Sequence, residues 1–469
     1  MRVPEPSFAG LRAELGVVEA FPPEVLAEVQ GLRPALPEHD ATALPLLTVD
    51  PEGSRDLDQA VHLEREGDGY RVRYAIADVG AFVALGSALD AEARRRGQTL
   101  YAPDVRVPLH PPALSEGAAS LLPGQVRPAA LWDLHLDARG EPREVGVARA
   151  LVRSTRQLTY AGVQAALDGG TDDPQLLLLR EVGRLRQERG AERGAVRLPS
   201  LEQAVEQHGD GPPVLTARAP LPVEGWNAEV SLLTGAVAAR LMLDGGVGLL
   251  RTMPPFDPAG VTALRRSALA LGVAWPEGAG YGEVVSRLDP YEPAHAALLV
   301  LATRLLRGAG YTALDTSLDP SDGTAADPAL TTHSAVGGPY AHVTAPLRRL
   351  VDRFATEVCL ALAAGRPVPD GVRAALPELP ALMAASDRRA GELERAAVDL
   401  AEAVVLAPRV GERFRAAVVE SGPKRSTVQL REPAVRARCE TPDLPLGEEV
   451  DVVLVRADPA ARAVVFARA

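Results

Sequence analysis

Residues 48–60 read TVDPEGSRDLDQA, a stretch that places three aspartates within nine positions. Asp56 and Asp58 are two residues apart, so in an extended chain both carboxylates point to one face, about 6–7 Å apart. Asp50 reaches the same face if the intervening PEGS makes a turn. Converging carboxylates repel one another unless a cation lies between them, and hard oxygen ligands suit Mg²⁺ or Mn²⁺. The functional interpretation is a metal site for phosphodiester cleavage, but these residues alone favour an ordinary Asp-rich loop that caps helices and faces water.

The bulk composition limits the possible functions. The chain of 469 residues is long enough for two or three domains. Its net charge of −12 repels nucleic acid overall, so a polyanion would need a local basic channel. Cys359 and Cys439 lack metal-site spacing, which argues against disulfides and Cys-bound zinc and is typical of a cytoplasmic protein. No apolar signal core or membrane-length apolar stretch is visible, so we expect no membrane partner.

Hydrophobic periodicity predicts a small helical module in residues 1–40, where Ser7 caps one helix and Pro22-Pro23 opens another. Strands follow in LLTVD, YRVRYAIADV, LWDLHLD and ARALVRS, and helices dominate residues 160–310. Two long helices are expected over residues 344–365, with Thr344 as cap and Pro346 in the first turn, and over residues 377–406. The tail returns to short strands with a five-strand rhythm, which predicts an OB-fold.

Four motifs in a fixed order surround the aspartates. They are DPEGSRDLDQ at 50–59, IADV at 76–79, GSALDAEARRRGQTLYAPD with PPALSEGAASLLP at 86–123, and TAPLRRLVD at 344–352. Together they resemble the ribonuclease II catalytic domain, shared by ribonuclease II, ribonuclease R and the eukaryotic exosome nuclease, over roughly residues 45 to 405.

The resemblance implies an α+β fold in three parts. A small helical module at 1–40 precedes an RNB-type catalytic domain at 41–405, in which a mixed sheet is packed by helices around a central RNA channel. An OB-fold β-barrel occupies residues 408–469. That barrel has few aromatic residues and many arginines, so we expect it to bind the RNA backbone more than the bases.

The activity implied by the resemblance is Mg²⁺-dependent 3′-to-5′ exoribonuclease action on single-stranded RNA, with release of nucleoside 5′-monophosphates; Mn²⁺ is the other candidate ion. Asp50, Asp56 and Asp58 then hold the metal and activate water. Arg348 contacts the scissile phosphate, with Arg349 as the second candidate. A monomer is expected.

The RNA-contacting residues are also implied by the resemblance. Tyr101 stacks on and positions the 3′-terminal nucleotide, and Tyr160 is another RNA-contacting tyrosine. Glu229 and Glu394 fall where the family places acidic groups near the 3′ end, where a carboxylate accepting from ribose hydroxyls helps select RNA. Leu198 replaces a family phenylalanine in the base clamp, which leaves one aromatic and one aliphatic wall.

The chain departs from the family pattern at Gln59, which stands at the position of the fourth aspartate. An amide oxygen can ligate a hard cation directly or through water, but it brings no charge. The alternatives are therefore an RNA-binding protein that has lost the chemistry, and a metal phosphodiesterase acting on cyclic or short oligonucleotides. Forty N-terminal residues cannot contain the two cold-shock OB-folds of bacterial relatives, so we expect a more open channel that admits RNA with a short 3′ overhang beside a duplex.

Overall fold

The computed structural model describes residues 7–199, 202–206, 213–316 and 327–469. Two short helices begin the described chain, α1 (Phe8–Glu14) and α2 (Pro23–Gln30). The Ser7 hydroxyl accepts a hydrogen bond from the Gly10 amide at 3.1 Å, as expected of an N-cap, and Pro23 opens α2. Both predicted helices are confirmed.

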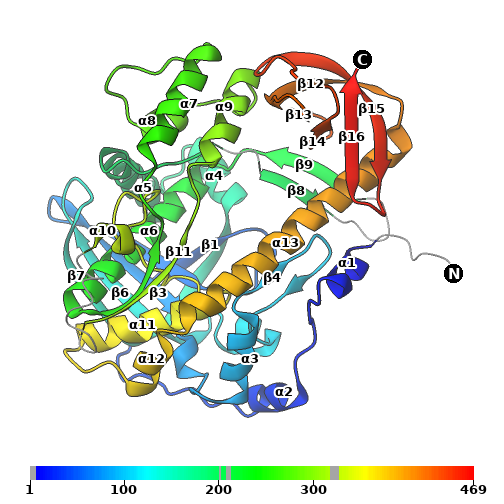
Figure 1. The fold of residues 1–469 in the computed structure, drawn as a ribbon. Helices are drawn as coiled ribbons and strands as arrows, with labels where there is room; N and C mark the ends of the chain where they lie inside the picture. The colour runs from blue at the N-terminus through cyan, green and yellow to red at the C-terminus, as the bar shows by residue number, and fades with distance from the viewer. Residues whose placement is uncertain (1–6, 200–201, 207–212, 317–326) are drawn as a thin grey trace.

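A closed five-stranded barrel forms the first half of the large domain (Figure 1). Its strands, in spatial order, are β1 (Leu46–Asp50), β2 (Gln59–Glu66), β3 (Gly69–Ala77), β6 (Val126–Leu136) and β7 (Pro142–Thr159). β1 pairs in parallel with β7, and the other neighbours are antiparallel. β1 ends at Asp50 and β2 begins at Gln59, so the aspartate-rich stretch connects two adjacent strands at one end of the barrel.

Helices cover the barrel, and α6 (Pro222–Gly245) packs on α5 (Pro174–Glu192) and α11 (Leu350–Ala363). The long helix α13 (Leu379–Leu406) crosses the molecule toward the C-terminal barrel (Figure 1). The remaining helices are η1 (Val79–Ala81), α3 (Ala88–Arg96), η2 (Leu114–Ala118), α4 (Tyr160–Asp168), α7 (Pro258–Ala270), α8 (Tyr281–Val285), α9 (Pro293–Thr303), α10 (Pro328–Thr331), α12 (Asp370–Ala375) and η4 (Ala407–Arg409). Among the described residues, three strand pairs lie outside the barrels: β4 (Leu100–Tyr101) with β5 (Arg106–Val107), β8 (Glu202–Glu206) with β9 (Val214–Arg218), and β10 (Val247–Thr252) with β11 (Gly310–Asp315).

The helix predicted over residues 344–365 begins six residues later than expected, at Leu350. The backbone amides of Ala345 and Leu347 donate to the carboxylates of Asp352 and Asp58, both at 2.7 Å. Arg349 is extended, with φ −134° and ψ 128°. Side-chain acceptors thus take two amides of the predicted first turn, and one of them, Asp58, is 289 residues from Leu347, so the sequence pattern could not show it.

The C-terminal barrel closes in the order β12-β13-β14-β16-β15. Its strands are β12 (Arg413–Glu420), β13 (Ser426–Gln429), β14 (Arg436–Cys439), β15 (Glu449–Asp458) and β16 (Ala463–Arg468). Phe414 and Phe466 meet edge to face inside it, with ring centroids 5.8 Å apart. The predicted α+β class and the five-stranded C-terminal barrel are confirmed.

Candidate active site

Asp50 ends β1 with one carboxylate oxygen buried. Its Oδ2 atom has no hydrogen-bond partner among the described residues. Burial raises the pKa of this carboxyl to about 6, opposed by the nearby Thr48 hydroxyl and by Arg348 and aided by the negative charge of Asp56. Across the parallel pairing Asp50 lies beside Thr159, which caps α4, so Tyr160 follows directly at this end of the barrel.

Asp58 joins two segments that are far apart in sequence. Its side chain is almost fully buried, Oδ1 accepts from the Leu347 amide at 2.7 Å, and Oδ2 lies 3.3 Å from the Arg348 Nε atom. Burial raises the pKa of Asp58 to about 7, against the opposing charge of Arg348. The DLDQ and TAPLRR motifs therefore meet at this carboxylate.

Asp56 is held by a residue that sequence reasoning missed. Arg106, on β5, forms an ion pair with Asp56 and a second one with Glu116 of η2. Arg106 lies between the two quoted parts of the motif at 86–123, and nothing in its spacing links it to an aspartate 50 residues earlier. The charge of Asp56 also acts on the pKa of both neighbouring aspartates, which places all three carboxylates in one electrostatic cluster.

Gln59 has both ends of its amide engaged. Its Nε2 atom donates to the Thr344 carbonyl at 2.7 Å, and its Oε1 atom accepts from the Tyr74 hydroxyl at 2.5 Å. The Ser231 hydroxyl lies 2.9 Å from the Tyr74 hydroxyl and 3.4 Å from Gln59 Oε1. Sequence reasoning missed these partners, although the β2–β3 register, with Val61 opposite Tyr74, places Tyr74 on the face of Gln59.

Arg348, Tyr101 and Tyr160 complete the cluster. The Arg348 side chain is 44% exposed and Tyr101 is 56% exposed, so both present surface to solvent. Burial raises the pKa of both phenols; Arg348 opposes each shift, while aspartates of the cluster favour it. The Thr99 amide donates to the Arg348 carbonyl at 3.0 Å, which fixes Tyr101 two residues away, and Asn227 donates to the Tyr160 hydroxyl at 3.3 Å.

Three of the expected RNA-contacting residues lie elsewhere. Arg349 turns inward and makes two hydrogen bonds to Asp352, at 2.9 and 2.8 Å. Leu198 is half-buried against the apolar cluster of α7, α8 and α9. Glu394 is exposed on α13.

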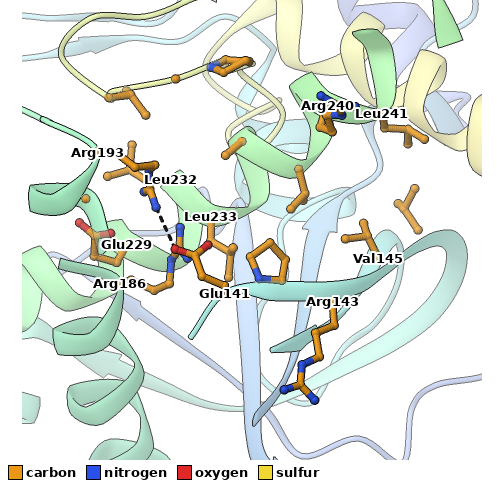
Figure 2. Close-up of a pocket in the computed structure, with 18 of the residues that line it drawn as sticks. Glu141, Arg143, Val145, Arg186, Arg193, Glu229, Leu232, Leu233, Arg240 and Leu241 are labelled. Carbon is orange, nitrogen blue, oxygen red and sulfur yellow. Dashed lines mark hydrogen bonds and ion pairs between the residues drawn. The ribbon is translucent and has the colours of Figure 1, made fainter. Parts of the chain in front are cut away.

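Glu229 lies in a cavity of about 1040 Å³ between α6, β7 and the end of α5 (Figure 2). It forms an ion pair with Arg197, and burial raises its pKa. Figure 2 shows Arg193 bonded to Glu141 at the same charged end, while Leu232 and Leu233 contribute apolar wall. On α6, Asn227 contacts Tyr160 and Ser231 contacts Gln59, whereas Glu229 between them pairs with Arg197.

The donor set fits a divalent cation. Within the described ranges, no three His, Cys, Asp or Glu side chains already form a metal cage. Asp50 nevertheless offers a buried, unpartnered oxygen next to the charge of Asp56, which is the kind of hard oxygen ligand that Mg²⁺ takes, usually together with water.

Comparison with known proteins identifies the fold family. Residues 38–361 match the RNB domain, and residues 412–469 match the RNase II-type exonuclease C-terminal S1 domain. The chain belongs to the RNB-domain family. The resemblance drawn from the four motifs is thereby confirmed.

Curated relatives include ribonuclease R of Acidithiobacillus ferrooxidans, 36% identical over 34% of this chain and 37% of that protein. Exoribonuclease 2 of Edwardsiella piscicida is 29% identical over 72% of this chain and 52% of that protein. The chain thus matches only about a third to a half of the length of these two relatives.

Solved structures confirm the fold. Mycoplasma genitalium RNase R in complex with ribose-methylated single-stranded RNA has a TM-score of 0.87 at 18% identity, over 98% of this chain and 77% of that one. The same protein in complex with double-stranded RNA has a TM-score of 0.84 at 19% identity, with coverages of 98% and 82%. Yeast Ssd1, described as a pseudonuclease, has a TM-score of 0.70 at 16% identity, with coverages of 92% and 54%. In the described part of the chain, no helix is long and apolar enough to cross a membrane.

Proposed function

We propose that this protein is an Mg²⁺-dependent 3′-to-5′ exoribonuclease that hydrolyses single-stranded RNA to nucleoside 5′-monophosphates. The observation that carries the proposal is the meeting of Asp58 with Leu347 and Arg348, beside the unpartnered oxygen of Asp50. Two motifs, whose residues Asp58 and Arg348 are 290 positions apart, meet at this point. They bring carboxylates that can bind a cation next to an exposed guanidinium that can bind a phosphate.

Asp50, Asp56 and Asp58 would hold the metal, which when bound neutralises phosphate charge and lowers the pKa of a water. The chain's own residues orient the substrate around it. Arg348 presents its exposed guanidinium to the scissile phosphate, where a two-point contact stabilises charge that grows in the transition state. Arg106 keeps Asp56 in place by pairing with it from β5.

For RNA binding, Tyr101 is supported by its exposed ring next to Arg348, where it can stack on the 3′-terminal base. Tyr160 is supported by its electrostatic coupling to Asp50. Glu229 would contact the terminal nucleotide only from within the cavity on the other face of α6. Leu198, the expected aliphatic wall of the base clamp, packs instead on the cluster of α7, α8 and α9. Arg349 acts through its buried partner Asp352 and so supports the fold more than the RNA.

An RNA with a short 3′ overhang next to a duplex is a second proposed substrate, supported by the similarity to an RNase R whose structure contains double-stranded RNA. The partner is RNA, and we propose a cytoplasmic monomer with Mg²⁺ or Mn²⁺. The domain division proposed is a helical module at 1–40, the catalytic domain at 41–405 and the OB-fold at 408–469, supported by the two family matches at 38–361 and 412–469.

The second candidate function is RNA binding without cleavage. It is favoured by Gln59, which lacks the charge of an aspartate, and by the similarity to a pseudonuclease fold. Against it, Asp50, Asp56, Asp58 and Arg348 are all present and lie in one cluster.

The test uses 5′-labelled single-stranded RNA with Mg²⁺, and EDTA as the metal-free control. A ladder that shortens from the 3′ end, with nucleoside 5′-monophosphates as products, supports the proposal. RNA that shifts on a gel but stays full length supports the binding protein, and cleavage of dinucleotides without cleavage of long RNA supports a different phosphodiesterase. The same RNA in a duplex with a short 3′ overhang tests the second substrate.

A further inference from the structure

Gln59 makes a continuous line of hydrogen bonds across the active site. Ser231 of α6 is within 2.9 Å of the Tyr74 hydroxyl, Tyr74 donates to Gln59 Oε1, and Gln59 Nε2 donates to the Thr344 carbonyl at 2.7 Å. Tyr74 is almost fully buried, so its hydroxyl needs this acceptor. Each group is hydrogen-bonded to the next, so the line runs from α6 to the segment before α11.

The Thr344 end of this line leads directly to Arg348. The segment between them is fixed at three points: the Thr344 carbonyl by Gln59, the Ala345 amide by Asp352, and the Leu347 amide by Asp58. Gln59 and Asp58 are consecutive residues, so the start of β2 holds the segment at both ends. This sets where the guanidinium of Arg348 stands relative to the Asp58 carboxylate.

The engaged amide also leaves Gln59 poorly placed as a metal ligand. Oε1 has two lone pairs, and the hydroxyls of Tyr74 and Ser231 already approach it, at 2.5 and 3.4 Å, so a metal would have to displace one of them. An aspartate at position 59 would be one methylene shorter and would present only acceptor oxygens toward the Thr344 carbonyl.

We propose that Gln59 is a positioning residue, which holds the Thr344–Arg348 segment against Asp58 through its amide, and is not a ligand of the metal. The proposal rests on the exoribonuclease function above and assigns the metal to the aspartates alone. It also explains how a glutamine can occupy this position without loss of the site.

The matched control is Gln175 of α5, whose side-chain amide makes two hydrogen bonds to the backbone of β2. Its Nε2 atom donates to the Leu63 carbonyl at 2.7 Å, and its Oε1 atom accepts from the Leu63 amide at 2.9 Å. Gln175→Met therefore removes comparable hydrogen bonds from the same strand without touching the segment that carries Arg348.

The experiment compares the full-length protein with Gln59→Met, Gln59→Asp, Gln175→Met and Asp50→Asn. Mn²⁺ affinity is measured by calorimetry, and kcat and KM are measured on single-stranded RNA. For Gln59→Met we expect kcat to fall about 10–100-fold with KM within about twofold, because misplacement of a reacting group by about 1 Å has that effect. Its Mn²⁺ affinity should stay within about threefold of that of the parent protein. The Mn²⁺ affinity of Asp50→Asn should fall at least about tenfold. Gln175→Met should keep the parent kcat.

Two outcomes overturn the proposal. One is a loss of Mn²⁺ affinity in Gln59→Met as large as in Asp50→Asn, and the other is a gain of both Mn²⁺ affinity and kcat in Gln59→Asp. Should Gln59→Met not fold, Tyr74→Phe replaces it, with a smaller fall in kcat expected at unchanged Mn²⁺ affinity, and an unchanged kcat counting against the proposal.

If the parent protein cleaves no RNA, the proposed function fails, but the inference about Gln59 is still tested. Hydrogen exchange at the Leu347 amide then replaces kcat. Protection should be lost in Gln59→Met and kept in Gln175→Met, and equal protection in both overturns the inference.

Discussion

Two adjacent arginines are expected to respond in opposite ways to the same substitution. Arg349 makes two hydrogen bonds to Asp352, whose side chain is 0% exposed and also accepts from the Ala345 amide. Arg348 is 44% exposed and contacts Asp58 with only one nitrogen, at 3.3 Å. Replacement of each by methionine keeps an unbranched apolar stem and removes the charged guanidinium.

The magnitudes follow from burial. Arg349→Met leaves Asp352 buried without its counter-ion, which costs about 3–5 kcal/mol of unfolding free energy. Arg348→Met also leaves a buried carboxyl, but Asp58 keeps the Leu347 amide as donor, and its pKa of about 7 lets it take up a proton, so we expect a smaller cost of about 1 kcal/mol. The chemistry should show the reverse order, since Arg348 is the residue proposed to contact the phosphate.

Urea unfolding followed by circular dichroism gives the midpoint and slope, and cleavage of labelled RNA is measured well below the midpoint. We expect Arg349→Met to unfold at clearly lower urea, and Arg348→Met to unfold near the parent midpoint but lose most of its activity. The reasoning is refuted if Arg348→Met is the less stable variant, or if Arg349→Met keeps the parent midpoint.

Further predictions concern pH and RNA binding. The pKa values of Asp50 and Asp58, raised to about 6 and about 7, mean that these groups stabilise the metal-free fold fully below about pH 4 and that this stabilisation is lost as the pH rises through 6 and 7. Saturating Mg²⁺ should therefore raise the melting temperature more at about pH 8 than at about pH 5, and an equal rise at both would contradict this. Tyr101→Ala should weaken RNA binding by about 1–3 kcal/mol with little change in melting temperature, because the ring is 56% exposed; unchanged affinity in a gel-shift titration would remove Tyr101 from the site.

Local patterns predicted much of the fold. The alternation in LLTVD and YRVRYAIADV gave two strands of the first barrel, and the five-strand rhythm of the tail gave the second. The predicted start of α11 was wrong because Arg349 is extended and the amides of Ala345 and Leu347 donate to the carboxylates of Asp352 and Asp58. Such long-range contacts leave no mark in local periodicity.

The site residues that lie in family motifs were predictable from the sequence. The single side chains that contact them were not. The aspartate motif and TAPLRR lie together, as expected of two motifs that belong to the same family. Arg106 was missed because an arginine in a strand carries no mark of its distant partner Asp56. The surroundings of Gln59 depend on Tyr74 and Ser231, which only the folded barrel and α6 bring together.

The central claim is that Asp58, with Arg348, belongs to a metal-dependent site that hydrolyses the 3′-terminal phosphodiester. The most direct measurement is a single-turnover assay of the parent and Asp58→Asn on RNA labelled in its 3′-terminal nucleotide, with Mg²⁺ and enzyme in excess. The account predicts that the parent releases the label first, as a nucleoside 5′-monophosphate, and that Asp58→Asn binds the same RNA but releases label at least 100-fold more slowly, about the effect of losing a group that acts in the transition state. Label released at the parent rate by Asp58→Asn would contradict it.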